Sequence, residues 1–123
     1  NVALNFDGTD CMVRGNRQLL TELVENLCQN AIRYNNDGGT VNVTVHKLGG
    51  KTVLTVEDNG IGIPKDQQER VFERFYRVDK SRSKETGGTG LGLAIVKHIV
   101  ELHDAGLTLD SEVGRGTTIK VEF

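Results

Sequence analysis

The sequence contains no tryptophan, a single proline and a single methionine, and only 5% of its 123 residues are aromatic. It also lacks any apolar run that approaches the length of a membrane span, and no secretory signal peptide is visible. Its two cysteines, Cys11 and Cys28, lie in apolar contexts without metal-ligand spacing, so we expect buried free thiols. The formal net charge of −2 gives no electrostatic reason to bind nucleic acid or an anionic membrane surface.

Glycine is the residue in excess, with 15 copies that cluster rather than spread. The length fits a single domain over residues 1–123. Apolar periodicity predicts two long helices, from a cap at Asn16 to about residue 34 and from 89 to 103, and a short helix over 67–76. Strands are predicted over 41–48, 53–57, 107–111 and 117–123, and a hairpin over 2–6 and 11–14. We therefore expect an α+β domain, with helices on one face of an antiparallel-rich sheet.

The stretch 58–64 (DNGIGIP) directly follows the predicted strand 53–57. Its glycines let the backbone turn sharply and let a ligand approach closely, and its isoleucines would give that ligand an apolar wall. Asp58, if partly buried beside them, needs a hydrogen-bond donor. Two interpretations remain open: a flat apolar ligand whose amino group faces Asp58, or an Asp-Asn-Gly turn that leads into a helix.

A polar stripe runs along the first predicted helix, where Glu22, Asn26, Asn30 and Arg33 share one face at about 100° per residue. Asparagine is unfavourable inside a helix because its amide competes for backbone hydrogen bonds. Amide oxygens suit a hard cation, and an arginine suits a phosphate. The alternative is a solvated stripe, or asparagines that bond to a neighbouring loop.

A glycine cluster at Gly87, Gly88, Gly90 and Gly92 opens the second long predicted helix. Successive N–H groups at a helix N-terminus bind anions, and glycines let phosphate oxygens approach. A flexible hinge is the alternative interpretation. The charged segment before it, about 77–88, is expected to be a mobile surface loop that supplies cations. Together with Asp58 and the asparagine stripe, these features indicate ATP with a divalent ion.

Five segments resemble the conserved boxes of bacterial sensor histidine kinases, in order and at family spacing. They are the N box at 25–34 (ENLCQNAIRY), the G1 box at 58–64, the F box at 71–77 (VFERFYR), the G2 box at 88–93 (GTGLGL) and the closing G-x-G-T at 114–118 (GRGTT). The resemblance implies the catalytic and ATP-binding domain of the gyrase, heat-shock chaperone, histidine kinase and mismatch-repair ATPase superfamily. It implies a Bergerat-type fold, a two-layer α/β sandwich whose mixed sheet is covered on one face by three helices.

The resemblance also implies which residues bind the adenine base. Asp58 would accept a hydrogen bond from the exocyclic amino group of adenine, and Thr117 would join the hydrogen bonding near Asp58. The residues that would shape the base pocket are Gly60, Ile61, Gly62 and Ile63.

At the phosphate end, the resemblance implies that Asn30 ligates Mg²⁺ through its amide oxygen and that Asn26 supports the metal and phosphate site. Arg33 would meet phosphates, and Tyr34 would pack near the nucleotide. Arg77 would reach the γ-phosphate from a mobile ATP lid over about 77–88. The residues whose amides would line the phosphates are Gly88, Thr89, Gly90, Leu91 and Gly92.

Asn26 distinguishes between branches of the superfamily. In relatives that hydrolyse ATP, a glutamate at this position activates water, and an amide cannot act as a general base. Glu25 is one residue further round the helix and points about 100° away. The resemblance therefore favours phosphoryl transfer to a histidine. His46, His98 and His103 all lack the sequence context of a phosphoacceptor, so the acceptor is expected on another domain.

The expected partners are a dimerisation and phosphoacceptor helical domain of the same kinase and, in the full pathway, a response regulator. Nucleic acid and direct membrane contact are not expected. The implied location is cytoplasmic, as the cytoplasmic portion of a membrane-anchored sensor. Two alternatives stay open: a non-catalytic nucleotide-sensing or docking module, and an anti-sigma-factor-type serine kinase.

Overall fold

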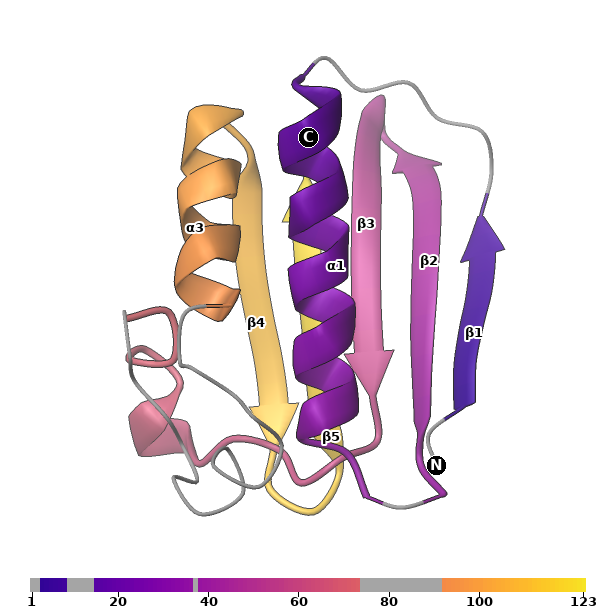
Figure 1. Cartoon of the computed structure of the whole chain (residues 1–123), viewed down its shortest axis with the longest axis vertical. Helices are drawn as coiled ribbons and strands as arrows, with labels where there is room; N and C mark the ends of the chain where they lie inside the picture. The colour runs from indigo at the N-terminus through magenta and orange to yellow at the C-terminus, as the bar shows by residue number, and fades with distance from the viewer. Residues whose placement is uncertain (1–2, 9–14, 37, 74–91) are drawn as a thin grey trace.

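The computed structural model describes residues 3–8, 15–36, 38–73 and 92–123, which form two layers. One layer is a five-stranded sheet, and the helices α1 (Arg17–Arg33) and α3 (Gly92–Leu102) lie side by side on one of its faces (Figure 1). The strands are β1 (Ala3–Gly8), β2 (Thr40–Leu48), β3 (Lys51–Asp58), β4 (Gly106–Glu112) and β5 (Gly116–Glu122).

The sheet is mixed, in the order β1-β2-β3-β5-β4. β1 runs parallel to β2, and the other neighbouring pairs are antiparallel. The predicted α+β fold with two layers is therefore confirmed. The N-terminal strand of the predicted hairpin pairs with β2, and the predicted partner strand 11–14 lies outside the described residues.

Both long helices are confirmed, and each buries an apolar face against the sheet. The Oδ1 atom of Asn16 accepts the N–H of Leu19 at 3.1 Å and caps α1 as predicted. The proposed first residues of the second helix, 89–91, lie outside the described part of the chain. The buried helix residues are Leu23, Leu27 and Ala31 on α1 and Leu93, Val96, Ile99 and Val100 on α3. Across from them lie the buried strand residues Val41, Val43, Leu54, Val56, Ile119 and Val121.

The short helix predicted over 67–76 is wrong for its described part. A single 3₁₀ turn, η1 (Lys65–Gln67), is followed by further turns to residue 72. The backbone bonds here join residues three apart, such as Arg70 N–H to Gln67 O at 3.0 Å and Glu73 N–H to Arg70 O at 2.9 Å. Within the described residues, two helices rather than three cover the sheet, because this segment never forms the four-residue spacing of an α-helix.

The end of α3 contains Asp104 with φ of 53°, the one non-glycine residue with a positive φ in the described part of the chain. The N–H of Ala105 bonds to Val100 O at 3.0 Å, and the N–H of Asp104 bonds to Glu101 O at 3.1 Å. This is the Schellman pattern, which places its left-handed residue at Asp104, where glycine is usual.

Cys28 is a half-buried free thiol, and burial raises its pKa, whereas Cys11 lies outside the described residues. Neither α1 nor α3, the long helices of the described chain, has the length and apolar character to cross a membrane. Figure 1 shows that the C-terminal ends of α1 and β3 and the β4–β5 turn lie at one end of the molecule, away from the N-terminus of α1. The predicted base-binding residues therefore gather at this end.

Candidate nucleotide site

Asp58, the last residue of β3, is a half-buried carboxylate at this end of the sheet. Burial raises the pKa of its carboxyl group, an effect that the backbone N–H groups of Gly60 and Thr117 oppose by bonding to it and that the charge of Glu57 reinforces. The Gly60 N–H lies 2.9 Å from Oδ1. The site thus holds a desolvated acceptor in a fixed orientation, as recognition of an amino group requires.

Gly60 lies where three segments approach too closely for a side chain. A Cβ at this position would overlap the Tyr34 carbonyl oxygen and lie 3.0 Å from Asp58 Oδ1. Gly62 has φ of +75°, and a Cβ there would overlap the Glu112 carbonyl oxygen. At both positions the turn packs so closely on its neighbours that only glycine fits.

The turn after Asp58 is bonded to both of its neighbours. Ile61 donates its N–H to Tyr34 O at 3.1 Å, and its carbonyl accepts the N–H of Gly114 at 3.0 Å. Asn59 Oδ1 accepts the N–H of Thr40 at 2.8 Å. Ile63 is buried and Ile61 is half-buried. The structure thus brings the predicted apolar wall to the C-terminal end of α1 and to the β4–β5 turn.

Two residues that sequence reasoning missed also hold this turn. Ser111 Oγ accepts the N–H of Ile63 at 2.8 Å and donates to Gly116 O at 2.9 Å. It also lies 2.8 Å from Thr117 Oγ1. The side-chain amide of Gln68 donates to Ile63 O and Ser111 O, both at 3.0 Å. Gln68 and Ser111 each reach a partner far away in the sequence, at separations of 43 residues for Gln68–Ser111 and 48 residues for Ile63–Ser111, so no local signal marks these contacts.

Asn26 and Asn30 are both half-buried on α1, one turn apart, while Glu22 on the same stripe is exposed. Asn26 Nδ2 donates to Glu22 O at 2.8 Å, which leaves its Oδ1 directed toward the first turn of α3. A Cβ on Gly92 would lie 3.4 Å from that oxygen. The Asn26 amide oxygen therefore lies beside Gly92, the first residue of α3.

The residues present fit a divalent cation through amide chemistry rather than through a carboxylate cluster. The described residues contain no group of three or more His, Cys, Asp or Glu side chains that could hold a metal ion. Asn30 has a half-buried amide whose oxygen is a suitable ligand for a hard cation. Arg33 and Tyr34 are half-buried at the end of the same helix, and the Tyr34 carbonyl already bonds the base-side turn.

Several predicted phosphate-binding residues cannot be placed. Arg77 and the predicted lid lie outside the described residues. The same holds for Gly88, Thr89, Gly90 and Leu91 of the glycine cluster, whereas Gly92 is the first residue of α3.

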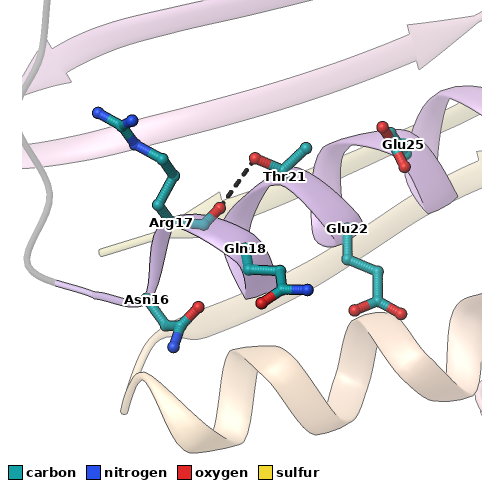
Figure 2. A pocket seen from close by; sticks show the side chains of 6 residues that line it. All are labelled: Asn16, Arg17, Gln18, Thr21, Glu22 and Glu25. Atoms are coloured by element: carbon teal, nitrogen blue, oxygen red, sulfur yellow. Dashed lines mark hydrogen bonds between the residues drawn. The ribbon is translucent and has the colours of Figure 1, made fainter.

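An open hollow lies elsewhere, along the N-terminal half of α1 (Figure 2). Its lining residues are all exposed, and one of its contacts is a local bond from Thr21 Oγ1 to Arg17 O at 2.8 Å. They are Asn16, Arg17, Gln18, Thr21, Glu22 and Glu25. This hollow is polar and shares only the exposed Glu22 with the predicted stripe, so it does not replace the site around Asp58.

Residues 15–123 match the family described as "Histidine kinase-, DNA gyrase B-, and HSP90-like ATPase". The chain is 52% identical over 115 residues to the sensor-like histidine kinase SenX3 of Mycolicibacterium smegmatis. That match covers 94% of this chain and 30% of SenX3, so the chain spans less than a third of this curated relative.

Solved structures of histidine kinases are also similar to this chain. The mycobacterial sensor histidine kinase MprB superposes with a TM-score of 0.85 at 32% identity, over 99% of this chain and 80% of that one. Full-length ShkA, solved in complex with AMPPNP, superposes with a TM-score of 0.79 at 25% identity, over 98% of this chain and 25% of ShkA. The similarity thus extends through the described helices and strands.

Proposed function

The chain belongs to the family of histidine kinase-, DNA gyrase B- and HSP90-like ATPases, and we propose that it binds Mg-ATP and transfers the γ-phosphoryl group to a histidine on a separate dimerisation and phosphoacceptor domain. The observation that carries the proposal is Asp58, a desolvated carboxylate held by two backbone N–H groups beside an apolar wall. The complex of ShkA with AMPPNP supports an adenine nucleotide as the ligand.

Asp58 selects the base through hydrogen-bond polarity. Adenine presents an amino group at the position where guanine presents a carbonyl oxygen. An ionised carboxylate accepts from the first and repels the second. Ile61 and Ile63 contact the flat faces of the ring, and Gly60 and Gly62 let the turn that carries these isoleucines pack closely on the neighbouring backbone.

The phosphates extend toward α1 and the start of α3. The Asn30 amide oxygen would hold Mg²⁺, which when bound supplies positive charge to neutralise the phosphates. Asn26 supports that end of the site, because its oxygen faces α3. Arg33, Arg77 and the Gly88–Gly92 segment bind phosphate oxygens, and Tyr34 packs near the nucleotide. The remaining chemistry is alignment of the γ-phosphoryl group with the attacking imidazole.

Transfer rather than hydrolysis is supported by Asn26, which has no basic lone pair and whose amide nitrogen is already bonded to Glu22 O. The acceptor lies outside this chain. His103, for example, is engaged at both ring nitrogens, by the Asn16 N–H at 3.1 Å and by Ile99 O at 2.8 Å. We accordingly propose a phosphoacceptor helical domain and a response regulator as partners, in the cytoplasmic part of a membrane-anchored sensor.

The first test is isothermal titration calorimetry of the 123-residue chain with ATP, with and without Mg²⁺. We expect binding of Mg-ATP with negligible turnover, and an absence of nucleotide binding would refute the proposal.

The second test adds a phosphoacceptor helical domain and ATP labelled at the γ-phosphate. Acid-labile, base-stable label on a histidine of that domain is the expected result. Label on serine would identify a serine kinase, and binding without label on any partner would indicate a nucleotide-sensing module.

A further inference from the structure

We propose that Ser111, which does not touch the ligand, determines nucleotide specificity by fixing the Thr117 hydroxyl as a hydrogen-bond acceptor. This inference rests on the proposed function, because it concerns the same adenine pocket. It assigns Ser111 the role of a positioning residue that acts through Thr117.

A serine hydroxyl carries a single proton, so it can donate one hydrogen bond. Ser111 Oγ lies 2.9 Å from Gly116 O, and a carbonyl oxygen can only accept, so the serine proton points to Gly116. The Ile63 N–H, 2.8 Å from the same Oγ, can only donate and takes one lone pair. The second lone pair remains for one further donor.

Thr117 supplies that donor. Its Oγ1 lies 2.8 Å from Ser111 Oγ, and either hydroxyl could in principle donate across that distance. Because the Ser111 proton is already bonded to Gly116, the Thr117 proton must point to Ser111. Thr117 Oγ1 is then left with lone pairs alone for any other group.

Thr117 lies next to Asp58, the residue that we propose binds the adenine base. Thr117 pairs with Asp58 across the β3–β5 ladder, and its backbone N–H bonds to the Asp58 carboxylate. Its side chain is buried, with 7% of its surface exposed, so a mismatched hydrogen-bond partner there is costly. Asp58 and Thr117 therefore form a pair of acceptors, which suits the amino group of adenine and opposes the carbonyl oxygen of guanine.

Ser111→Ala tests this assignment. Without the serine, the Thr117 hydroxyl can rotate and donate, so guanine becomes less unfavourable. We expect the ratio of the dissociation constants for GTP and ATP, measured by calorimetry with Mg²⁺, to fall by roughly tenfold. Ser111→Thr, which restores the hydroxyl, should return the ratio toward the wild-type value. A Ser111→Ala variant with the wild-type ratio would overturn the proposal.

Two controls separate polarity from loosening of the turn. Gln68→Met removes the two bonds from Gln68 to Ile63 O and Ser111 O but leaves the serine proton on Gly116. It should weaken ATP and GTP by the same factor and leave their ratio unchanged; a lower ratio would show that loosening alone relaxes specificity and would overturn the proposal. Thr108→Ala removes a hydroxyl from the exposed face of β4 and should change neither constant.

A double-mutant cycle with Thr117→Val tests whether Ser111 acts through Thr117. In the Thr117→Val background, Ser111→Ala should have no further effect on the ratio, and a full additional effect would overturn the proposal. If Ser111→Ala does not fold, Ser111→Cys takes its place, because a thiol of similar size is a weak donor. A wild-type chain that binds no Mg-ATP would refute the proposed function itself, and this inference with it, whereas an unchanged ratio refutes this inference alone.

Discussion

Replacing Asp58 with asparagine should weaken ATP binding in a chain that still folds. The substitution keeps the size and shape of the side chain and one carbonyl-type oxygen, which can still accept the Gly60 N–H at 2.9 Å. The other oxygen becomes an NH₂ group and meets either the Thr117 N–H or the amino group of adenine. One donor therefore faces another donor in a half-buried position, which is unfavourable.

The size of the effect on binding follows from the charge that is lost. A hydrogen bond to a charged group contributes about 1.5–3 kcal/mol, which corresponds to roughly a 10- to 150-fold increase in the dissociation constant of ATP. Inorganic triphosphate has no base and should bind the variant as it binds the wild type. The matched control is Asp110→Asn, the same chemical change on the exposed face of β4.

The substitution should also change how folding stability depends on pH. Burial raises the pKa of Asp58 above its ordinary value of 3.8, so the ionised form is less favourable in the folded chain than in the unfolded chain. The wild type therefore loses stability as the pH rises from 3.8 through the folded-state pKa, and it loses no more above that. The Asp58→Asn variant has no such titration, so its stability relative to the wild type should rise between pH 3 and pH 7.

Calorimetry gives the affinities, and urea unfolding at several pH values gives the stabilities. The reasoning would be refuted if the variant bound ATP like the wild type. It would also be refuted if the stability difference between variant and wild type did not change between pH 3 and pH 7.

Three further predictions concern other parts of the domain. Asn30→Ala should abolish most of the gain in ATP affinity that Mg²⁺ gives while preserving metal-free binding, as measured by calorimetry with EDTA; an unchanged Mg²⁺ dependence would remove Asn30 as the metal ligand. Gly62→Ala should destabilise the fold by about 1–3 kcal/mol in urea, because φ is +75° and the new Cβ overlaps the Glu112 carbonyl oxygen; a cost below about 0.5 kcal/mol would contradict that geometry. Asp104→Gly should stabilise the fold by about 0.5–1 kcal/mol, because its φ of 53° costs aspartate more than glycine, and a lower midpoint would argue against this.

Most of the fold could be predicted because its signals are local. Asn16 precedes an apolar stripe of helical spacing, and both hairpins of the sheet are joined by glycine-containing turns. The helix prediction failed over 67–73, the described part of the predicted helix 67–76, where Val71 and Phe72 suggested a helix face. The side-chain amide of Gln68 bonds that segment to Ile63 O and Ser111 O. The apolar pattern gives no sign of the bond to Ser111, because Ser111 lies 43 residues further along the sequence.

The two glycines of the proposed base-binding turn could be identified from the sequence for a related reason. Gly60 and Gly62 lie against the carbonyl oxygens of Tyr34 and Glu112, so any side chain there would be excluded and the glycines persist as a visible motif. Ser111 leaves no such trace, since a serine in a strand reads the same whether it is solvated or bonded to three partners. Its role appears only once the β4–β5 turn is placed beside the residues that follow β3.

Ionisation of Asp58 is less favourable in the folded chain than in the unfolded chain, because burial raises the pKa of its carboxyl group. An apolar or amide side chain at the end of β3 would avoid the desolvation of a carboxylate, and the two backbone N–H bonds from Gly60 and Thr117 offset that penalty without removing it, since the pKa remains raised. The unfavourable term therefore persists in the free domain. A donor that bonds to the carboxylate would offset this penalty, so part of the favourable free energy of binding would come from it. Guanine in the same orientation would present its carbonyl oxygen there and could not supply this donor, so the carboxylate would favour adenine in the proposed site.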